Sequence, residues 1–356
     1  MKYRVEKSGK PAYLQVYEQL RADIIDGVYP YGGRLPSKRL LAEELGISTV
    51  TAEHAYSLLC DEGYLEARER SGYFVSFRER DVFLPPDTPP IPTAAPVSGG
   101  GEFPFSVLAK TMRRVLSDHG EALMVKPENT GCAVLRQALS RYLARSRGIH
   151  ARPEQIVIGA GAEYLYGLIV GLLGRERVYA AESPSYEKIE QVYRADGVTC
   201  DMLPLGSDGI RSEALAATEA TVLHITPYRS FPTGVTASAS KKREYLRWAT
   251  EGRYIVEDDF ESEFTLSHKP EDTVFALSTQ GNVLYVNTFS QSISPAFRVG
   301  YMVLPPRLLA EFEQRVGFYS CTVPTFEQYV LAQLLDSGEF ERHLNRVRRR
   351  KRQEKN

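Results

Sequence analysis

The stretch at residues 155–174, QIVIGAGAEYLYGLIVGLLG, determines the fold of most of this chain. It opens with an apolar run of strand length, passes through a glycine turn and continues with apolar residues for the length of a helix. Similar apolar runs that end in polar or charged residues recur as RVYAAESPSY at 177–186, TVLHITP at 221–227, YIVEDDF at 254–260 and NVLYVNTF at 282–289. Strands that alternate with helices predict an α/β fold, with a mostly parallel sheet and helices on both faces.

Polar residues stand at the carboxyl ends of several of these predicted strands. In a parallel sheet that is covered on both faces, the ligand crevice lies beyond these ends. We therefore expect a binding site formed by Gly161, Glu182, Asp258, Asp259, Ser290 and Gln291.

Length and composition limit the class of protein. A length of 356 residues predicts two or three domains, and a formal net charge of −1 gives no overall sign of binding to nucleic acid or membrane. The four cysteines lie far apart, which argues against a metal or redox motif and indicates reduced thiols. The sequence shows neither a signal peptide nor an apolar run of membrane-spanning length, so we expect a cytoplasmic protein.

A segment at residues 79–101, rich in proline, glycine and small residues, has the composition of a linker. The part before it, residues 1–78, has the element order of a winged helix-turn-helix. Ser37 and Ser48 are the predicted amino-terminal caps of its second and third helices. Helical spacing and short β-type runs predict helices at 13–27, 37–46 and 48–63, followed by a hairpin of strands at 64–68 and 72–77.

In a helix-turn-helix, the start of the second helix of the motif contacts base edges, and neighbouring groups hold phosphates. Here that helix begins at Ser48, with Thr49 and Thr51 as short polar side chains for base contacts. The alternative is a helical interaction module whose charges are only a solvated surface. The residues expected to contact DNA are Arg34, Ser37, Lys38, Arg39, Ser48, Thr49 and Thr51, with Arg70 and Tyr73 on the wing.

Three motifs in this part are GGRLPS at 32–37, LCDEGYL at 59–65 and SGYFV at 71–75. With them, residues 1–78 closely resemble the DNA-binding domain of the GntR family of bacterial regulators. The resemblance implies a double-stranded DNA operator. It also shows a departure, because the family commonly has an arginine where this chain has Thr49, so we expect a weaker half-site contact or a different operator.

The remaining residues, 102–356, carry seven motifs in a fixed order, among them ESPSYE at 182–187, TPYRSFPTG at 226–234 and VEDDFESEF at 256–264. Together with the GntR-like part they resemble the MocR subgroup, whose body is related to fold type I aminotransferases. The resemblance implies a large domain of the fold that is typical of pyridoxal phosphate-dependent transferases, and a homodimer. The small carboxyl-terminal domain of such proteins is expected to be missing from this chain.

The resemblance also implies a site for pyridoxal phosphate, which needs phosphate donors, an anion at its ring nitrogen, an aromatic neighbour and a lysine. Asp258 matches the ring-nitrogen partner and Tyr186 the aromatic neighbour, whereas Glu163 replaces a neutral amide and would repel a phosphate if ionised. The residues that match the phosphate site are Gly161, Ala162, Thr288, Ser290 and Arg298.

The position of the lysine is occupied by Gln291. Because an amide cannot form a Schiff base, we expect pyridoxal phosphate to bind non-covalently at most, and the aminotransferase-like domain to be catalytically inactive. The sequence therefore favours a DNA-binding regulator whose body serves for dimerisation or for sensing a small-molecule effector, with no membrane partner. Two alternatives remain, a working pyridoxal phosphate-dependent aminotransferase and a truncated relative without function.

Overall fold

The computed structural model describes residues 3–5, 9–69, 71–77, 103–250, 252–265 and 272–353. The chain forms two compact units, Met1–Ala95 and Pro96–Asn356. The predicted linker at residues 79–101 and the predicted wing residue Arg70 lie outside the described residues. Within these ranges no helix is both long and apolar enough to cross a membrane, and the four cysteines are free thiols.

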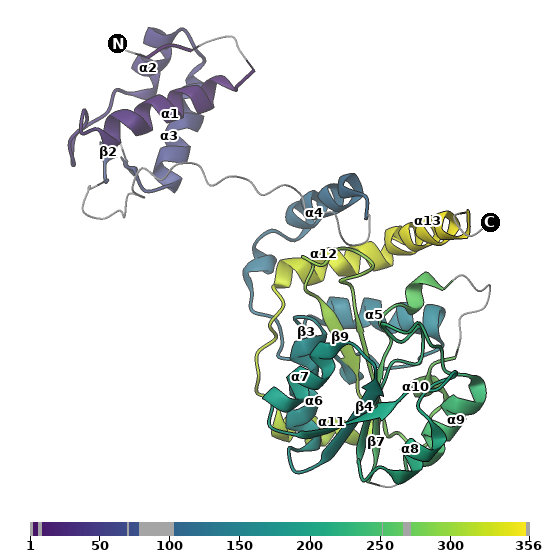
Figure 1. The fold of residues 1–356 in the computed structure, drawn as a ribbon. Helices are drawn as coiled ribbons and strands as arrows, with labels where there is room; N and C mark the ends of the chain where they lie inside the picture. The colour runs from purple at the N-terminus through teal and green to yellow at the C-terminus, as the bar shows by residue number, and fades with distance from the viewer. Residues whose placement is uncertain are drawn as a thin grey trace. The chain divides into compact units, whose positions relative to one another are not determined.

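The larger unit is built on a seven-stranded sheet (Figure 1). Its strands are β3 (Ile156–Gly159), β4 (Val178–Ser183), β5 (Thr199–Pro204), β6 (Val222–Ile225), β7 (Tyr254–Asp258), β8 (Val283–Thr288) and β9 (Gly300–Val303). They lie in the order β3-β9-β8-β7-β6-β4-β5. Strand β9 runs antiparallel to β3 and β8, and the other neighbours are parallel. The predicted mostly parallel sheet is confirmed, with one reversed strand that the pattern did not indicate.

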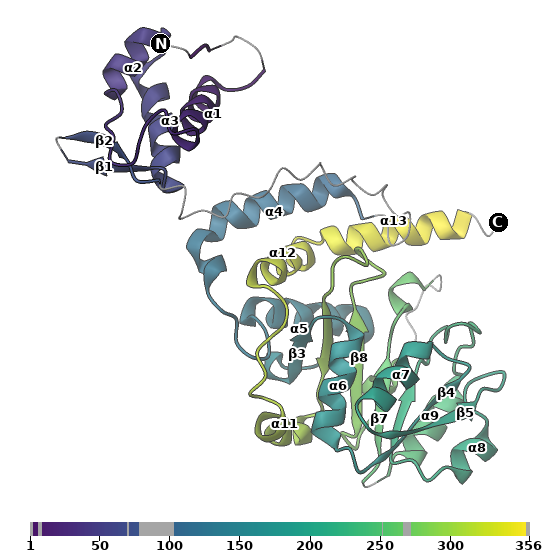
Figure 2. The same cartoon turned by 60° about the vertical axis from the view of Figure 1, so that its left-hand side comes forward.

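Helices cover both faces of this sheet, as predicted. The helices of the larger unit are α4 (Phe105–His119), α5 (Ala133–Arg147), α6 (Ala162–Leu173), α7 (Glu187–Ala195), α8 (Ser212–Ala217), α9 (Ala239–Trp248), α10 (Val274–Leu277), α11 (Leu309–Arg315), α12 (Thr325–Asp336) and α13 (Glu339–Gln353). Consecutive side chains of a strand point to opposite faces. Thus Ile156 and Ile158 belong to the core with α5, α12 and α13, whereas Val157 belongs to the core with α6, α7 and α11. Figure 2 shows α4 lying along α12.

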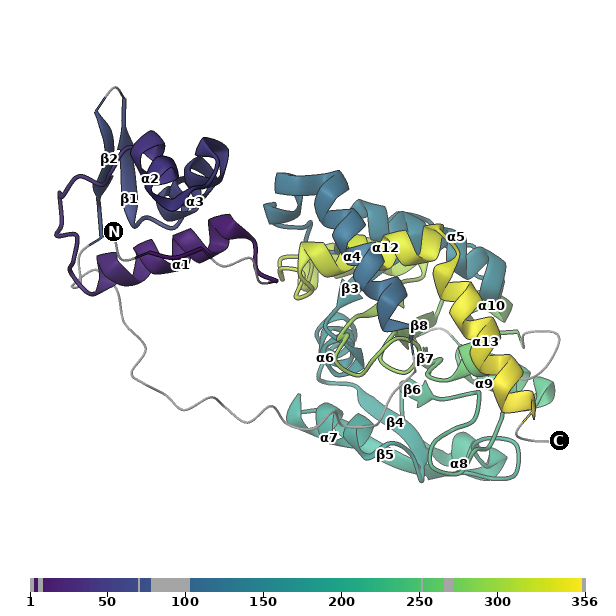
Figure 3. The ribbon, with the colours of Figure 1, turned by 90° about the horizontal axis from the view of Figure 1, so that it is seen from above.

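The smaller unit has the predicted element order of a winged helix-turn-helix. Three helices, α1 (Ala12–Ile25), α2 (Lys38–Leu45) and α3 (Thr49–Asp61), precede an antiparallel hairpin of β1 (Leu65–Arg68) and β2 (Gly72–Val75). Their shared core includes Leu20, Leu41 and Tyr56, none of which has exposed surface. Figure 3 shows the hairpin projecting from the three helices.

Both predicted caps of this unit are present. The Ser37 hydroxyl accepts a hydrogen bond from the backbone N–H of Leu40 (3.2 Å), and that of Ser48 accepts one from the backbone N–H of Thr51 (3.1 Å). Gly46 ends α2 with a φ of 63°, a left-handed conformation that favours glycine. Each cap contributes about 1 kcal/mol to helix stability. The caps fix the start of α3, the helix predicted to contact bases.

Candidate functional site

A pocket of about 360 Å³ opens at the carboxyl ends of the central strands of the sheet, where the sequence predicts a ligand site. Seven of the residues predicted there line it, namely Ala162, Tyr186, Asp258, Thr288, Ser290, Gln291 and Arg298. The other lining residues are Glu163, Tyr166, Ile189, Thr226, Phe231, Phe260 and Pro295. The pocket thus combines aromatic walls with a small number of charged and polar groups, which is typical of small-molecule sites.

Gly161 stands at the start of α6 with a φ of 90°. A Cβ atom at this position would lie 2.6 Å from Nη2 of Arg298, so only glycine allows the guanidinium to approach the backbone this closely. Unpaired N–H groups gather at the start of a helix and favour an anion there. Arg298 and the first turn of α6 therefore lie together at one corner of the pocket and offer the kind of donors that an anion needs; Thr288 and Ser290 line the same pocket.

Glu163 stands in this corner and is already paired. Its carboxylate accepts hydrogen bonds from Nη2 of Arg298 (2.9 Å) and from Nζ of Lys188 (2.7 Å). The hydrogen bond from Lys188 and the positive charges of both partners lower the pKa of Glu163 below its ordinary value. The carboxylate is therefore ionised at neutral pH, the condition under which the sequence predicts repulsion of a phosphate. Lys188 was not predicted, because a contact across 25 residues leaves no local pattern.

The pocket lining also includes Asp258, which is buried. Its carboxylate accepts a hydrogen bond from the phenol of Tyr166, and the Nε2 atom of His224 lies 3.7 Å away. The other ring nitrogen of His224 is hydrogen-bonded to the hydroxyl of Tyr193 (2.8 Å). Burial raises the pKa of Tyr166, which keeps this phenol protonated as a donor. The sequence prediction missed Tyr166 and His224, since both lie in apolar runs that fit a core equally well.

Glu182 lies at the predicted edge of the sheet but does not line the pocket. Its carboxylate accepts hydrogen bonds from the backbone N–H of Thr226 (3.2 Å) and from the Ser230 hydroxyl (2.5 Å). Burial raises the pKa of Glu182 to about 7. Its role is to hold the loop after β6, which supplies Phe231 to the pocket wall.

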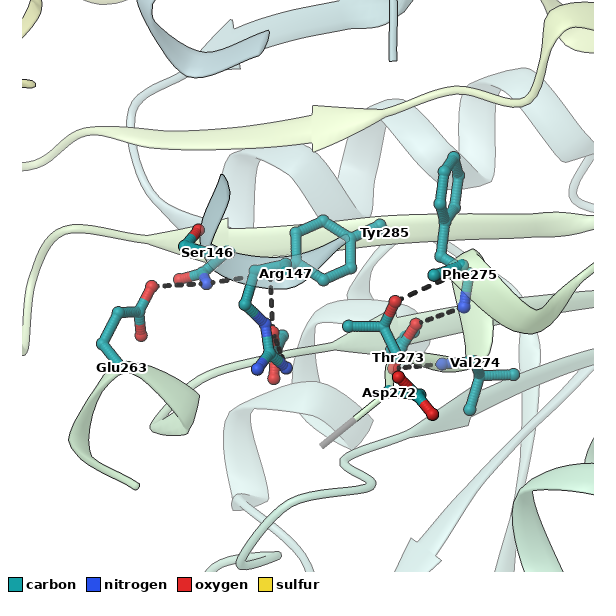
Figure 4. Close-up of polar contacts among 12 residues, drawn as sticks. Ser146, Arg147, Glu263, Asp272, Thr273, Val274, Phe275 and Tyr285 are labelled. Carbon is teal, nitrogen blue, oxygen red and sulfur yellow. Dashed lines mark hydrogen bonds and ion pairs between the residues drawn. The ribbon is translucent and has the colours of Figure 1, made fainter. Parts of the chain in front are cut away.

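The expectation that Asp259 joins Asp258 in the pocket is wrong. Consecutive residues at the end of β7 face opposite sides, and Asp259 forms a buried ion pair with Arg147 at the end of α5 (2.6 Å). It also accepts a hydrogen bond from the hydroxyl of Tyr285 (2.6 Å). Nearby, Nδ2 of Asn287 donates a hydrogen bond to Glu263 (2.8 Å). We call this group, shown in part in Figure 4, the Arg147 cluster; it consists of Arg147, Asp259, Glu263, Tyr285 and Asn287.

Replacing Glu263 by Gln is expected to reduce the pH dependence of stability. Burial raises the pKa of Glu263 to about 7, well above its ordinary value of 4.5. The stability contributed by such a raised pKa is full below 4.5 and is lost as the pH rises through about 7. The free energy of unfolding of Glu263→Gln should therefore exceed that of the wild type by roughly 2 kcal/mol at pH 8 and by little at pH 4.5.

The measurement is the free energy of unfolding by urea from pH 4.5 to pH 8. Glu213→Gln, at an exposed position in α8, is the control and should follow the wild type. Burial also raises the pKa values of Glu182 and Glu257 to about 7. The fall of the free energy of unfolding with rising pH should therefore become less steep in Glu263→Gln but should not disappear. An unchanged slope in Glu263→Gln would contradict the prediction.

In the smaller unit, the first turn of α3 presents Ser48, Thr49 and Val50 as exposed residues. Val50 is 72% exposed. Thr51 is half-buried, and its hydroxyl lies 2.8 Å from that of Ser48. Of the two threonines predicted to contact bases, Thr49 has the more accessible side chain, because the hydroxyl of Thr51 lies against that of Ser48.

The predicted phosphate contacts surround this turn from other elements. Lys38, in the first turn of α2, is joined to α3 by an ion pair with Glu53 (2.5 Å). Arg39 is exposed, and the side chain of Arg34 lies against Gly72 of the wing. Tyr73 is half-buried, and its ring packs against that of Tyr56 in the core with a centroid distance of 4.5 Å. Tyr73 is therefore expected to contact DNA with a side chain that also packs the wing against the core.

Comparison with known proteins agrees with this architecture. Residues 12–75 match the model of bacterial regulatory proteins of the gntR family, and residues 97–356 match that of aminotransferase class I and II. The HTH-type transcriptional regulator YdeL of Bacillus subtilis (strain 168) is 31% identical over 353 residues, which cover 95% of this chain and 76% of YdeL. The regulatory protein MocR of Rhizobium meliloti is 28% identical over 95% of this chain and 74% of its own length.

The larger unit is similar to solved aminotransferases. The crystal structure of Pyrococcus horikoshii kynurenine aminotransferase matches with a TM-score of 0.63 and 25% identity, over 69% of this chain and 64% of that one. This chain therefore spans less than two thirds of that aminotransferase. An aminotransferase domain suggests pyridoxal phosphate binding, and the relatives with both parts are transcriptional regulators. The chain belongs to the GntR/MocR family of HTH-type transcriptional regulators, in which a helix-turn-helix domain is joined to an aminotransferase-like domain.

Proposed function

We propose that this protein is a homodimeric, sequence-specific DNA-binding regulator whose aminotransferase-like body senses a small-molecule effector without covalent chemistry. The observation that carries the second half of this proposal is Gln291, which lines the pocket together with Asp258 and Arg298 and has no amine. We assign residues 1–78 to DNA binding and residues 102–356 to the body, with residues 79–101 as the linker.

The residues present fit pyridoxal phosphate except at two positions, Gln291 in place of the covalent anchor and the Glu163 carboxylate in the phosphate corner. Arg298, Thr288, Ser290 and the start of α6 offer donors to a phosphate, and Asp258 offers an anion to a ring nitrogen. Tyr186 and Phe231 form aromatic walls, with ring centroids 6.5 Å apart. When bound, the cofactor supplies an electron sink for amino acid chemistry. Without a lysine amine the chain can position such a molecule but cannot bond to it, which supports binding over catalysis.

Exposed apolar residues on the body support a homodimer. Met124 is 87% exposed and Phe318 is 66% exposed. The segments that carry them are tied together, because Nδ2 of Asn129 donates a hydrogen bond to the backbone carbonyl of Gly317 (2.9 Å). Each of them has an exposed apolar neighbour in the sequence, Val125 and Tyr319, and exposed large apolar side chains that gather on a folded unit mark an interaction site. A dimer would present two α3 helices to a repeated operator.

Replacing Thr49 by Ala is expected to weaken specific DNA binding about fivefold and to relax the preference for one base, because a single hydrogen bond or methyl contact to a base edge contributes about 1 kcal/mol. The measurement is fluorescence anisotropy of the full chain on a duplex from the region upstream of its own gene, against a scrambled duplex. Ser57→Ala, at an exposed position further along α3, is the control and should bind like the wild type.

The same assay tests the proposal as a whole. Wild-type protein that binds the specific and the scrambled duplex equally would contradict sequence-specific regulation. Equal loss on both duplexes in Thr49→Ala would instead contradict only the assignment of Thr49 to base contact.

A further inference from the structure

We propose that Glu163 determines the specificity of the pocket by occupying the anion position at Arg298 with its own carboxylate. This inference rests on the proposed ligand-binding function of the body. It predicts that the pocket binds the phosphorylated form of a pyridine ligand less tightly than it would without this carboxylate, against what the donors at the start of α6 would favour by themselves.

The geometry of the corner leads to this inference. Glu163 lies in the first turn of α6, immediately after the residues whose N–H groups would receive a phosphate. One of its carboxylate oxygens accepts from Arg298 (2.9 Å) and the other from Lys188 (2.7 Å). Both oxygens are therefore engaged, and the carboxylate bridges Arg298, which lines the pocket, and Lys188, which lies outside the pocket lining.

The charges of the corner show that Glu163 lowers the affinity for a phosphate. Arg298 and Lys188 bring two positive charges, and Glu163, whose pKa is lowered by these partners, cancels one of them. A phosphate that contacts Arg298 has to displace this carboxylate and then lies within a few ångströms of it. Like charges at such a distance repel each other strongly unless water intervenes.

The partial exposure of the corner limits how much phosphate affinity is lost. The side chains of Glu163 and Arg298 are 35% and 49% exposed, so solvent weakens both the ion pair and the repulsion. We therefore expect a loss of phosphate affinity of about tenfold rather than complete exclusion. A ligand with a hydroxymethyl group in place of the phosphate avoids this loss and can donate a hydrogen bond to the Glu163 carboxylate.

The experiment compares two probes that lack an aldehyde and so do not react with surface lysines, pyridoxine and pyridoxine 5′-phosphate. Their dissociation constants are measured on the full chain by isothermal titration calorimetry, for the wild type, Glu163→Gln and Glu190→Gln. The glutamine at position 163 keeps the length of the side chain and removes its charge. Glu190 is the matched control, since it also pairs with an arginine, Arg194 (2.8 Å), and lies outside the pocket lining.

Glu163→Gln is expected to bind pyridoxine 5′-phosphate about tenfold more tightly than the wild type, with a change of less than about twofold for pyridoxine. Glu190→Gln should change neither constant. If the wild type binds the probes and Glu163→Gln leaves the ratio of their affinities unchanged, the inference is overturned and the ligand-binding function stands. If no form binds either probe while all remain folded by circular dichroism, both the inference and the ligand-sensing function are overturned.

Discussion

Replacing Arg147 by Met is expected to destabilise the aminotransferase-like body by about 3–5 kcal/mol, the cost of removing one partner from a buried ion pair. The side chains of Arg147 and Asp259 are 7% and 2% exposed. Burial and the charge of Asp259 raise the pKa of the nearby Glu263, whereas the charge of Arg147 lowers it. Without the guanidinium, the cluster keeps its carboxylates and loses the cation that compensates them.

Urea unfolding followed by tryptophan fluorescence measures this loss, because Trp248 is the only tryptophan of the chain and is buried in the body. Arg141→Met is the matched control on the same helix. Its ion pair with Asp336 is exposed, with side chains that are 50% and 42% accessible, so its loss should cost less than about 1 kcal/mol. Adding Asp259→Asn to Arg147→Met should recover part of the stability. Equal losses in the two arginine variants would contradict a buried, charge-dependent role for Arg147.

Replacing Gln291 by Lys is expected to convert a protein without covalent affinity for pyridoxal phosphate into one that is modified in near-stoichiometric amounts. The substitution places a primary amine in a pocket that is also lined by Asp258 and Arg298. Partial burial and the like charge of Arg298 in the same pocket disfavour the charged form of this amine, which leaves more of it nucleophilic at neutral pH. The result is read after borohydride reduction as one pyridoxyl group per chain, located by peptide mass spectrometry at position 291.

Gln291→Arg is the control for this experiment, because it adds the same charge and a long side chain but cannot form the bond. It should remain unmodified at position 291, as should the wild type. Failure of Gln291→Lys to react at saturating pyridoxal phosphate would show that the pocket does not hold the cofactor in a productive position. Stoichiometric modification of a lysine in the wild-type pocket would contradict the proposal of non-covalent sensing.

Much of the fold could be predicted from the sequence because its signals are local. Glycine turns, serine caps and apolar runs of strand length fixed the element order, and the run at Tyr254–Asp258 placed Asp258 at the end of a strand. The direction of β9 could not be predicted, since an apolar run does not encode whether it pairs parallel or antiparallel. The direction depends on where the chain re-enters the sheet.

The pocket was harder to predict than the fold, because its decisive contacts join distant parts of the chain. Tyr166 and Asp258 are 92 residues apart, and Glu163 and Arg298 are 135 residues apart. Helical spacing assigns Tyr166 to a core, and only the tertiary arrangement turns its phenol toward a carboxylate. The sequence could therefore predict which groups lie near the ligand, but not which of them already form hydrogen bonds or ion pairs with other residues of the chain.

Asp258 and Asp259 share a peptide bond, yet one contacts the pocket and the other contacts Arg147 on the opposite side of the sheet. A ligand that binds Asp258 would therefore contact the residue next to Asp259, whose side chain is held by Arg147 at the end of α5. The ligand pocket and the end of α5 are thus connected through two consecutive residues at the end of β7.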